Sequence, residues 1–508
     1  MTGLAEFEKN SIEQAITEIF YRYGYGIPAQ DLLKKIGVVS ENAGFGAFLI
    51  GGFPRDIIIH ILKSNPETSD KFKSSKVFES KQIASLALAM TKQRKFKSSE
   101  VFESNPRFLD LDIAVRGSAE KLAFLIKEKK NLKFKLNYLK AHKKFGTASL
   151  EFLVNGMPLK IDLASLRTEV YKKPGMLPEV NTAKTGLKDD ISRRDFTINT
   201  VAFSINRKDF LKIKDYSSGI RDILNKKISV LHDLSFIDDP TRMFRAVRFE
   251  KRLGFRIGGK TLKLIKTALD KNILDNISGK RITAELYLLL KEKKPEIYFE
   301  RLDKLNILSS VYGKLKFGKK NKIVFKKISV YFNEPDKAGK IRRVCKDIDI
   351  NMFYMAEIFY GLSNSELSEA VKRLNMGQKI EKMLEAVYSD IKKINNLKAN
   401  NLFNLSVKNT GIYDKLNKID AKSVLFYLFK DCGRNEPDLN FRKIIVRYLN
   451  KIILIKPYLS GHDVKSMGIC EGPLCGKILN EIKLLKIEGR LKSKKDELEY
   501  IKKNYIKN

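Results

Sequence analysis

The stretch NPRFLDLDIAVRG, residues 105–117, places Asp110 and Asp112 two positions apart in an otherwise apolar run. The core of this stretch, LDLDIAV (109–115), has the length and composition of a β-strand. Residues i and i+2 of a strand point to the same face, so the two carboxylates would converge. Like charges that close repel, and a divalent cation bound by oxygen ligands relieves the repulsion. The stretch therefore predicts a metal-binding strand, with a solvated edge strand as the alternative.

The residues upstream of these aspartates favour the metal-binding interpretation. The Asp-x-Asp spacing alone is weak, because KDIDI repeats it at Asp347 and Asp349 without a supporting motif. Upstream, FLIGGFPRDIII (48–59) predicts a strand, a Gly-Gly turn and a helix that starts near Pro54. Glycines at a helix N-terminus let backbone N–H groups approach a phosphate, and the helix dipole favours the anion. Together the two segments predict a triphosphate cradle beside a metal site.

A third acidic residue lies on a later strand. Asp162 is flanked by apolar residues in KIDLASL (160–166). Its side chain can complete a carboxylate cluster with Asp110 and Asp112. An ion pair between Asp162 and the nearby Arg167 is the alternative.

The composition indicates a large protein that binds a polyanion. The chain has 508 residues, which corresponds to roughly three domains of about 150 residues each. Lys and Arg number 98 against 59 Asp and Glu, and the net charge is +39. Such an excess of positive charge predicts a nucleic-acid partner.

Cysteine usage and the lack of long apolar runs exclude several other classes. The four cysteines, Cys345, Cys432, Cys470 and Cys475, form no CxxC pair, and there are only four histidines. This pattern argues against zinc sites and against a disulfide framework. No apolar run approaches the ~18 residues of a membrane span, and the first residues lack the features of a signal peptide. A cytoplasmic protein without a membrane partner is expected.

The apolar pattern predicts an α+β fold in the first half of the chain and helices thereafter. Four β-like runs stand out, GAFLIGG (46–52), LDLDIAV (109–115), GTASLEFLV (146–154) and LKIDLASL (159–166). After about residue 215, Leu and Ile recur at three- and four-residue spacing beside Lys-rich faces, which is typical of helices.

A near-exact duplication interrupts the first half. KFKSSKVFES (71–80) and KFKSSEVFES (95–104) are nearly identical, but two units are too few for a stacked repeat. The Ser and Lys content of residues 64–104 predicts a flexible, functionally neutral insertion. A basic arm that contacts RNA is the alternative.

Two later segments carry clustered arginines. ISRRDFTINTVAF (191–203) places two arginines and an aspartate before an apolar run. In SFIDDPTRMFRAVRFEKRLGF (235–255), the Asp-Pro pair predicts a helix start, because Asp is a favoured N-cap and Pro fits the first turn. Arg242, Arg245 and Arg248 then recur every third residue and cover about a third of the helix circumference. They can hardly all be core, so a basic stripe that faces nucleotide or RNA is predicted.

The order of these motifs resembles a known family. GGFPRD, LDLDIAV, RRDFTINTVAF and DDPTRMFRAVRFEKRLGF resemble the class II tRNA nucleotidyltransferases, which are the CCA-adding enzymes and their CC-adding and A-adding relatives. LRTEVYKKPGMLPEV, VLHDLSF and GHDVKSMGICEGPLCGKIL are similar to further segments of the family. Two departures occur: Pro54 replaces the usual Val, and the link over residues 57–109 is longer than usual.

The resemblance implies a fold and a domain order. The fold would be α+β, with a polymerase-beta-like nucleotidyltransferase head built on a mixed sheet, followed by an all-helical neck, body and tail. The expected parts are an N-terminal helical extension (1–40), the head (41–215), a neck that recognises the base (216–295), and a body and tail that bind tRNA (296–508).

The resemblance also implies residue roles. Asp110 and Asp112 would bind two Mg²⁺ ions, with Asp162 as a third catalytic acid. Asp195 would accept a hydrogen bond from the ribose 2′-hydroxyl, and Asp239 with Arg242 would read the incoming base. Asp239 as a simple helix cap is the alternative. The full set of expected nucleotide-binding residues is Gly51, Gly52, Arg55, Arg194, Asp195, Asn199, Asp239, Arg242, Arg245 and Arg248.

The implied activity is addition of C, A or both from CTP and ATP to the 3′ end of tRNA, with release of pyrophosphate. One alternative is a poly(A) polymerase, but AHKKFGTASLEF (141–152) differs from the RRFR-to-HV signature of that branch. A catalytically silent RNA-binding protein is the other. The motifs do not distinguish CC, A and CCA addition, and they indicate no oligomeric state.

Overall fold

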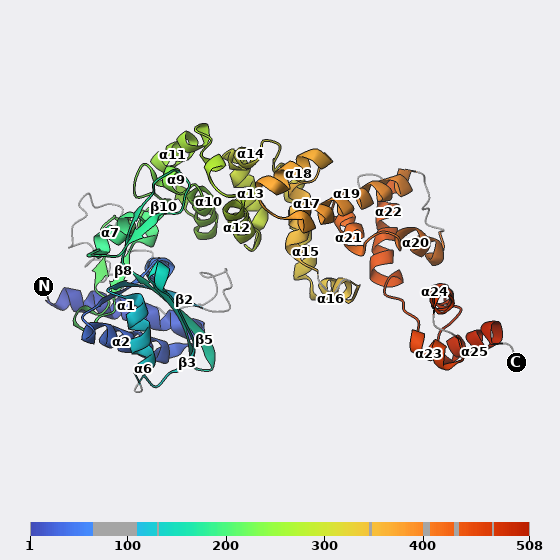
Figure 1. Ribbon diagram of the computed structural model, residues 1–508, viewed down its shortest axis with the longest axis horizontal. Coiled ribbons are helices and arrows are strands. Elements are labelled where there is room, and N and C mark those ends of the chain that lie inside the picture. The colour runs from blue at the N-terminus through green and yellow to red at the C-terminus, as the bar shows by residue number, and fades with distance from the viewer. Residues whose placement is uncertain are drawn as a thin grey trace. The chain divides into compact units, whose positions relative to one another are not determined.

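The computed structural model describes residues 2–64, 109–129, 132–344, 348–399, 407–430, 436–469 and 472–506. Most of the predicted insertion, residues 65–104, lies outside these ranges, as do Cys345, Cys432 and Cys470. The chain divides into two compact units (Figure 1). The first contains Met1–Arg281 and Leu305–Ser310, and the second contains Ile282–Lys304 and Val311–Asn508.

A seven-stranded mixed sheet forms the centre of the first unit. Its strand order is β3-β4-β5-β2-β1-β8-β9. The strands are β1 (Gly46–Ile50), β2 (Asp110–Arg116), β3 (Lys135–His142), β4 (Thr147–Val154), β5 (Met157–Ser165), β8 (Ala202–Ser204) and β9 (Ile213–Lys214). Strands β2 and β5 are parallel, and the other neighbours are antiparallel. The four predicted runs are β1, β2, β4 and β5, so the α+β prediction with a mixed sheet is confirmed.

Helices cover the sheet and bury its central strands. Figure 1 shows α2 (Gly26–Asn42) and α6 (Ala119–Glu128) on the same side of the sheet, next to α1 (Thr2–Arg22). All five residues of β1 are buried, as expected for a strand covered by helices. The N-terminal helices therefore belong to the same compact unit as the sheet.

The rest of the first unit consists of short elements. These are α3 (Gly52–Ser64), η3 (Lys143–Phe145), β6 (Thr168–Val170), β7 (Glu179–Asn181), α7 (Leu187–Ser192), η4 (Thr197–Asn199), η5 (Arg207–Asp209), α8 (Gly219–Leu224), β10 (Lys227–Ile228), α9 (Ser235–Asp238), α10 (Arg242–Leu253), β11 (Arg256–Ile257), α11 (Gly259–Asp270), η6 (Ile273–Asn276) and the start of α12 (Gly279–Leu290).

Helix α10 begins later than predicted. The Asp239-Pro240 pair precedes the helix by a short turn, and α10 starts at Arg242. The Asp239 side chain accepts a hydrogen bond from the backbone N–H of Thr241 (3.0 Å), and the Pro240 carbonyl accepts one from Met243 N (3.1 Å). Asp239 therefore caps this turn, and the first α-helical residue follows it.

Beyond α12, every described element is a helix. These helices are α13 (Pro295–Lys304), α14 (Ile307–Val311), α15 (Lys319–Asn333), α16 (Pro335–Val344), α17 (Ile350–Ile358), α18 (Asn364–Arg373), α19 (Gln378–Ala399), α20 (Asn409–Leu416), α21 (Ala421–Lys430), α22 (Glu436–Arg447), η7 (Tyr448–Ile452), α23 (Gly461–Ser466), α24 (Pro473–Ile487) and α25 (Lys494–Tyr505). The prediction that the chain after about residue 215 is mostly helical is confirmed. The expected all-helical neck (216–295) is corrected in one respect, because β10 and β11 form a short parallel pair within it. Across the described ranges, no helix has the length and apolar character needed to cross a membrane.

Candidate active site

Three carboxylates converge on one face of the sheet. Asp110 and Asp112 are the two exposed acidic positions of β2, which alternate with buried residues. Asp112 pairs with Asp162 across the parallel β2–β5 ladder, so their side chains leave the sheet on the same side. Partial desolvation by the surrounding protein, followed by the charge of Asp162 and then that of Asp110, raises the pKa of Asp112 to about 6. The cluster therefore favours a bound cation.

Asp162 is held in the cluster by its neighbours. The Ser149 hydroxyl donates a hydrogen bond to Asp162 Oδ1 (2.6 Å), and Lys160 Nζ lies 2.6 Å from Oδ2. The alternative of an Asp162–Arg167 ion pair is wrong, because Arg167 pairs with Glu169 at 2.8 Å. Asp162 thus belongs to the acidic cluster, and its catalytic role remains a prediction.

The Gly-Gly turn lies directly against the carboxylates. Strand β1 ends at Ile50, opposite Asp112 in the antiparallel ladder. Gly51 follows with φ +86°, and a Cβ atom there would lie 3.1 Å from Asp112 Oδ2. The positive φ favours glycine, and the close approach leaves little room for a side chain. Because α3 begins at Gly52, the N-terminus of that helix lies beside the acids. This is the geometry expected of a phosphate cradle.

Arg55 is part of a buried network. Its exposed fraction is 5%, and its guanidinium donates to Asp56 Oδ1 (2.8 Å) and Asn199 Oδ1 (2.7 Å). Asn199 in turn donates to Asp195 Oδ1 (3.1 Å). Asn199 and Asp195, both predicted nucleotide-binding residues, are therefore connected to α3 through Arg55. Contact of this network with a triphosphate stays a prediction.

Asp195 is buried and hydrogen-bonded by protein groups. Besides Asn199, Phe196 N donates to Oδ1 (2.8 Å), and Arg245 Nε donates to Oδ2 (3.0 Å). Burial alone would raise the pKa of this carboxyl, but the Arg245 charge and the hydrogen bonds hold it below its usual value. Asp195 is therefore a negatively charged acceptor for these three groups. Its contact with a ribose hydroxyl stays a prediction.

The two arginines before Asp195 are anchored by an acid that the sequence reasoning missed. Asp190, within α7, is 1% exposed and lies 2.6 Å from Arg193 Nη2 and 2.8 Å from Arg194 Nη2. Burial alone would raise the pKa of Asp190, and the two guanidinium charges lower it below its usual value. The Arg194 charge also lowers the pKa of Asp112, against the larger effects that raise it. The three- and four-residue spacing from Asp190 to the arginines is the signal that could have identified it.

Asp190→Ala is expected to lower the free energy of unfolding by about 3 kcal/mol, because two largely buried guanidinium groups would lose their shared counter-charge. Urea denaturation of the purified variant measures this loss. Asp189→Ala is the matched control, since the side chain of Asp189 is exposed and accepts a hydrogen bond from Gly186 N at the start of α7. Its cost should not exceed about 1 kcal/mol. Equal losses in the two variants would contradict the anchoring role.

Two of the three arginines predicted to form a basic stripe on α10 are buried. Arg242 and Arg248 are 5% and 8% exposed, and only Arg245 is half-exposed. Arg242 donates to Ser235 Oγ (2.7 Å) and to the Arg193 carbonyl (2.7 Å). Residues from α9 and from the segment after α7 thus satisfy the guanidinium, which permits its burial. The predicted nucleotide contacts of these arginines remain untested.

Asp239 and Arg242 use different protein partners. Asp239 Oδ1 accepts hydrogen bonds from Thr241 N and from Arg281 Nη2 (2.8 Å), whereas Arg242 points to Ser235 and Arg193. The capping role considered for Asp239 is therefore present. Within the described part of the chain, no hydrogen bond to Asp239 Oδ2 is found, so this oxygen remains available to a ligand.

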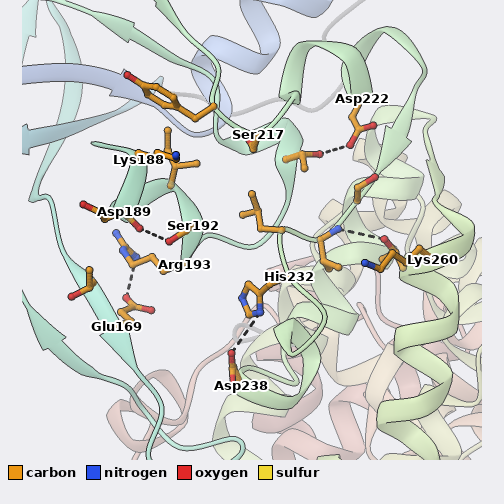
Figure 2. A pocket seen from close by; sticks show the side chains of 18 of the residues that line it. Glu169, Lys188, Asp189, Ser192, Arg193, Ser217, Asp222, His232, Asp238 and Lys260 are labelled. Carbon is orange, nitrogen blue, oxygen red and sulfur yellow. Dashed lines mark hydrogen bonds and ion pairs between the residues drawn. The ribbon is translucent and has the colours of Figure 1, made fainter. Parts of the chain in front are cut away.

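A cavity of about 800 Å³ lies near this region, and none of the three clustered acids lines it. Figure 2 shows Arg193 directed to Glu169 and His232 directed to Asp238 at its wall. Burial, and then the Arg242 charge, lowers the pKa of His232. The cavity is therefore separate from the acidic cluster.

The donor set of the acidic cluster fits magnesium. Across the described ranges, no group of three or more His, Cys, Asp or Glu side chains is arranged to hold a metal ion. Mg²⁺ commonly uses one or two carboxylates and completes its octahedron with water and substrate phosphates. Asp110 and Asp112, which repel each other beside the phosphate cradle, meet that requirement.

Comparison with known proteins places this arrangement in a class. Residues 47–229 match the family model of the poly A polymerase head domain, and residues 254–315 match the probable RNA and SrmB-binding site of polymerase A. A Thermotoga maritima CCA-adding enzyme complexed with tRNA superimposes with a TM-score of 0.63 over 92% of this chain and 94% of that one. At 23% identity this likeness shows the fold alone. Fold and site together define a nucleotidyltransferase-type head.

Three curated relatives narrow the class. An A-adding tRNA nucleotidyltransferase of Geobacter sulfurreducens is 30% identical over 77% of this chain, which spans 42% of that relative. An A-adding tRNA nucleotidyltransferase of Halalkalibacterium halodurans is 28% identical over 77% of this chain and 83% of its own length. A CCA-adding enzyme of Francisella tularensis subsp. novicida is 30% identical over 52% of this chain and 68% of its own length. The chain belongs to the class II tRNA nucleotidyltransferases.

Proposed function

We propose that this protein adds C, A or both to the 3′ end of tRNA without a template, using CTP and ATP. The observation that carries the proposal is the shared face of Asp110 and Asp112 beside the Gly51 turn and the N-terminus of α3. The names of the curated relatives support tRNA as the acceptor. A addition is the first activity to test, because two relatives that each match 77% of this chain are named A-adding enzymes.

The reaction is a nucleotidyl transfer. The 3′-oxygen of the RNA forms a bond to the α-phosphorus, the bond from that phosphorus to the bridging oxygen breaks, the hydroxyl proton is released and pyrophosphate leaves. Asp110 and Asp112 would hold the divalent cations. When bound, these Mg²⁺ ions would lower the pKa of the attacking hydroxyl and neutralise the phosphate charge.

The chain's own groups orient the nucleotide. Backbone N–H groups at the start of α3 and the Arg194 guanidinium, which already acts on Asp112, would bind the triphosphate. Asp195 would accept a hydrogen bond from the ribose. Asp239 would meet the base through Oδ2, while Arg242 would have to exchange its protein partners for the base.

Primer extension on defined RNAs tests the proposal. Transcripts of one tRNA that lack the CCA end, end in C or end in CC are offered CTP, ATP or both with Mg²⁺, and the products are sized. We expect addition of one to three nucleotides and no addition after chelation of the metal by EDTA. Long homopolymeric A tails on unrelated RNA would indicate a poly(A) polymerase instead. No incorporation into any RNA would refute an enzymatic function.

A further inference from the structure

Arg281 is the ion-pair partner of Asp239. It lies in the first turn of α12, and its Nη2 is 2.8 Å from Asp239 Oδ1. The two side chains are 27% and 21% exposed, so the pair is largely withdrawn from water. The backbone N–H and the hydroxyl of Thr241 donate to the same oxygen, and a carboxylate oxygen held by three donors has little freedom to rotate.

Arg281 also anchors a loop from the other side. Its Nη1 donates to the Gly175 carbonyl (2.8 Å), and Gly175 N donates to the Ile237 carbonyl (3.2 Å). Gly175 has φ +73°, and a Cβ atom there would lie 2.9 Å from the Asn276 carbonyl oxygen. The Arg281 guanidinium therefore connects the start of α12 to this loop and to Asp239, and a backbone hydrogen bond connects the loop to the segment before Asp239.

We propose that Arg281 is a positioning residue for base choice, which holds Asp239 Oδ1 so that Oδ2 faces the incoming base. The inference rests on the proposed function, since it assigns Arg281 a part in nucleotide selection. The planar fork of Arg suits this task because two of its nitrogens make separate hydrogen bonds in fixed directions. A rotating carboxylate would present its oxygens in several directions and would discriminate less well between an amino group and a carbonyl.

A structural role and a positioning role have different kinetic signatures. If Arg281 only stabilised the loop, its replacement would lower the addition of all four nucleotides by the same factor. If it positions Asp239, addition of CTP and ATP falls relative to UTP and GTP, because only C and A place an amino donor where the Asp239 acceptor would meet it, whereas U and G place a carbonyl there. The ratio of kcat/KM values therefore separates the two roles.

The experiment measures single-nucleotide kcat/KM for CTP, UTP, ATP and GTP in Arg281→Gln and in the wild type. We expect the CTP-to-UTP ratio to fall by about tenfold, the effect of one weakened hydrogen bond to a charged group. Lys280→Ala is the matched control, because Lys280 is the exposed neighbour of Arg281 on α12. Its ratio should equal that of the wild type.

The double variant Asp239→Asn with Arg281→Gln keeps the inference falsifiable if Arg281→Gln does not fold. The double variant leaves no unpaired Asp239 charge, and its nucleotide ratios should match those of Asp239→Asn alone. An unchanged ratio in Arg281→Gln, a uniform loss for all four nucleotides, or a further tenfold loss of discrimination in the double variant would overturn the inference. A wild-type protein that extends no RNA would refute the proposed function instead.

Discussion

Asp112→Ala is expected to lower the rate of nucleotide addition by at least ~1,000-fold, because removing one preorganised electrostatic group already costs 100- to 1,000-fold and a metal ligand carries more. The same change should leave tRNA affinity within about twofold, since RNA binding depends on dispersed positive charge. Single-turnover extension and filter binding measure the two quantities. The variant should also unfold at an equal or higher temperature, because it relieves the repulsion between Asp112 and Asp162.

Asp349→Ala is the matched control for this change. Asp349 ends the second Asp-x-Asp sequence of the chain, but its side chain caps α17 by accepting a hydrogen bond from Asn351 N (2.9 Å). Its replacement should cost about 1 kcal/mol of stability and leave addition unchanged. Near-normal turnover in Asp112→Ala, or an equal loss in Asp349→Ala, would contradict the metal-binding role of the β2 acids.

The acidic cluster could be predicted because its geometry is local. The period of two in a strand brings Asp110 and Asp112 to one face whatever surrounds them. The Gly-Gly turn was also predictable, since the positive φ of Gly51 is a property of one residue. For Asp162, the sequence left open whether it joins the acidic cluster or pairs with Arg167. The residue opposite Asp162 in the sheet depends on the order of the strands, which the sequence does not reveal.

The burial of the α10 arginines could not be predicted from their spacing. Arginines at every third position lie on one part of a helix surface, but their spacing does not reveal which other segments pack against that surface. Arg242 is buried because Ser235 and the Arg193 carbonyl, both outside the helix, satisfy its guanidinium. The role of Arg281 was missed for a similar reason. Arg281 meets Asp239 across 42 residues of sequence, and no local pattern connects them.

Asp239→Asn is expected to raise addition of UTP and GTP relative to CTP and ATP by about 10- to 100-fold, the value of one to two hydrogen bonds. C and A share an exocyclic amino donor next to a ring-nitrogen acceptor, whereas U and G present a carbonyl next to a ring N–H. In the proposed role, the Oδ2 oxygen of Asp239 would accept a hydrogen bond from the amino group and would repel the carbonyl. An amide at this position can keep its oxygen on Thr241 N and Arg281 while its NH₂ group donates to the carbonyl of U or G.

The capping contact of Asp239 makes this substitution informative. Since Oδ1 already accepts from Thr241 N and Arg281 Nη2, a purely structural Asp239 would need only that one oxygen, which Asn also supplies. Asp239→Asn would then cost at most ~1 kcal/mol of stability and leave base choice unchanged. Single-nucleotide kcat/KM values for the four triphosphates, with thermal unfolding of the same preparation, distinguish the two cases. If the variant is destabilised but its kcat/KM ratios among the four triphosphates equal those of the wild type, Asp239 only caps the turn before α10. If the variant is stable but these ratios change, Asp239 reads the base.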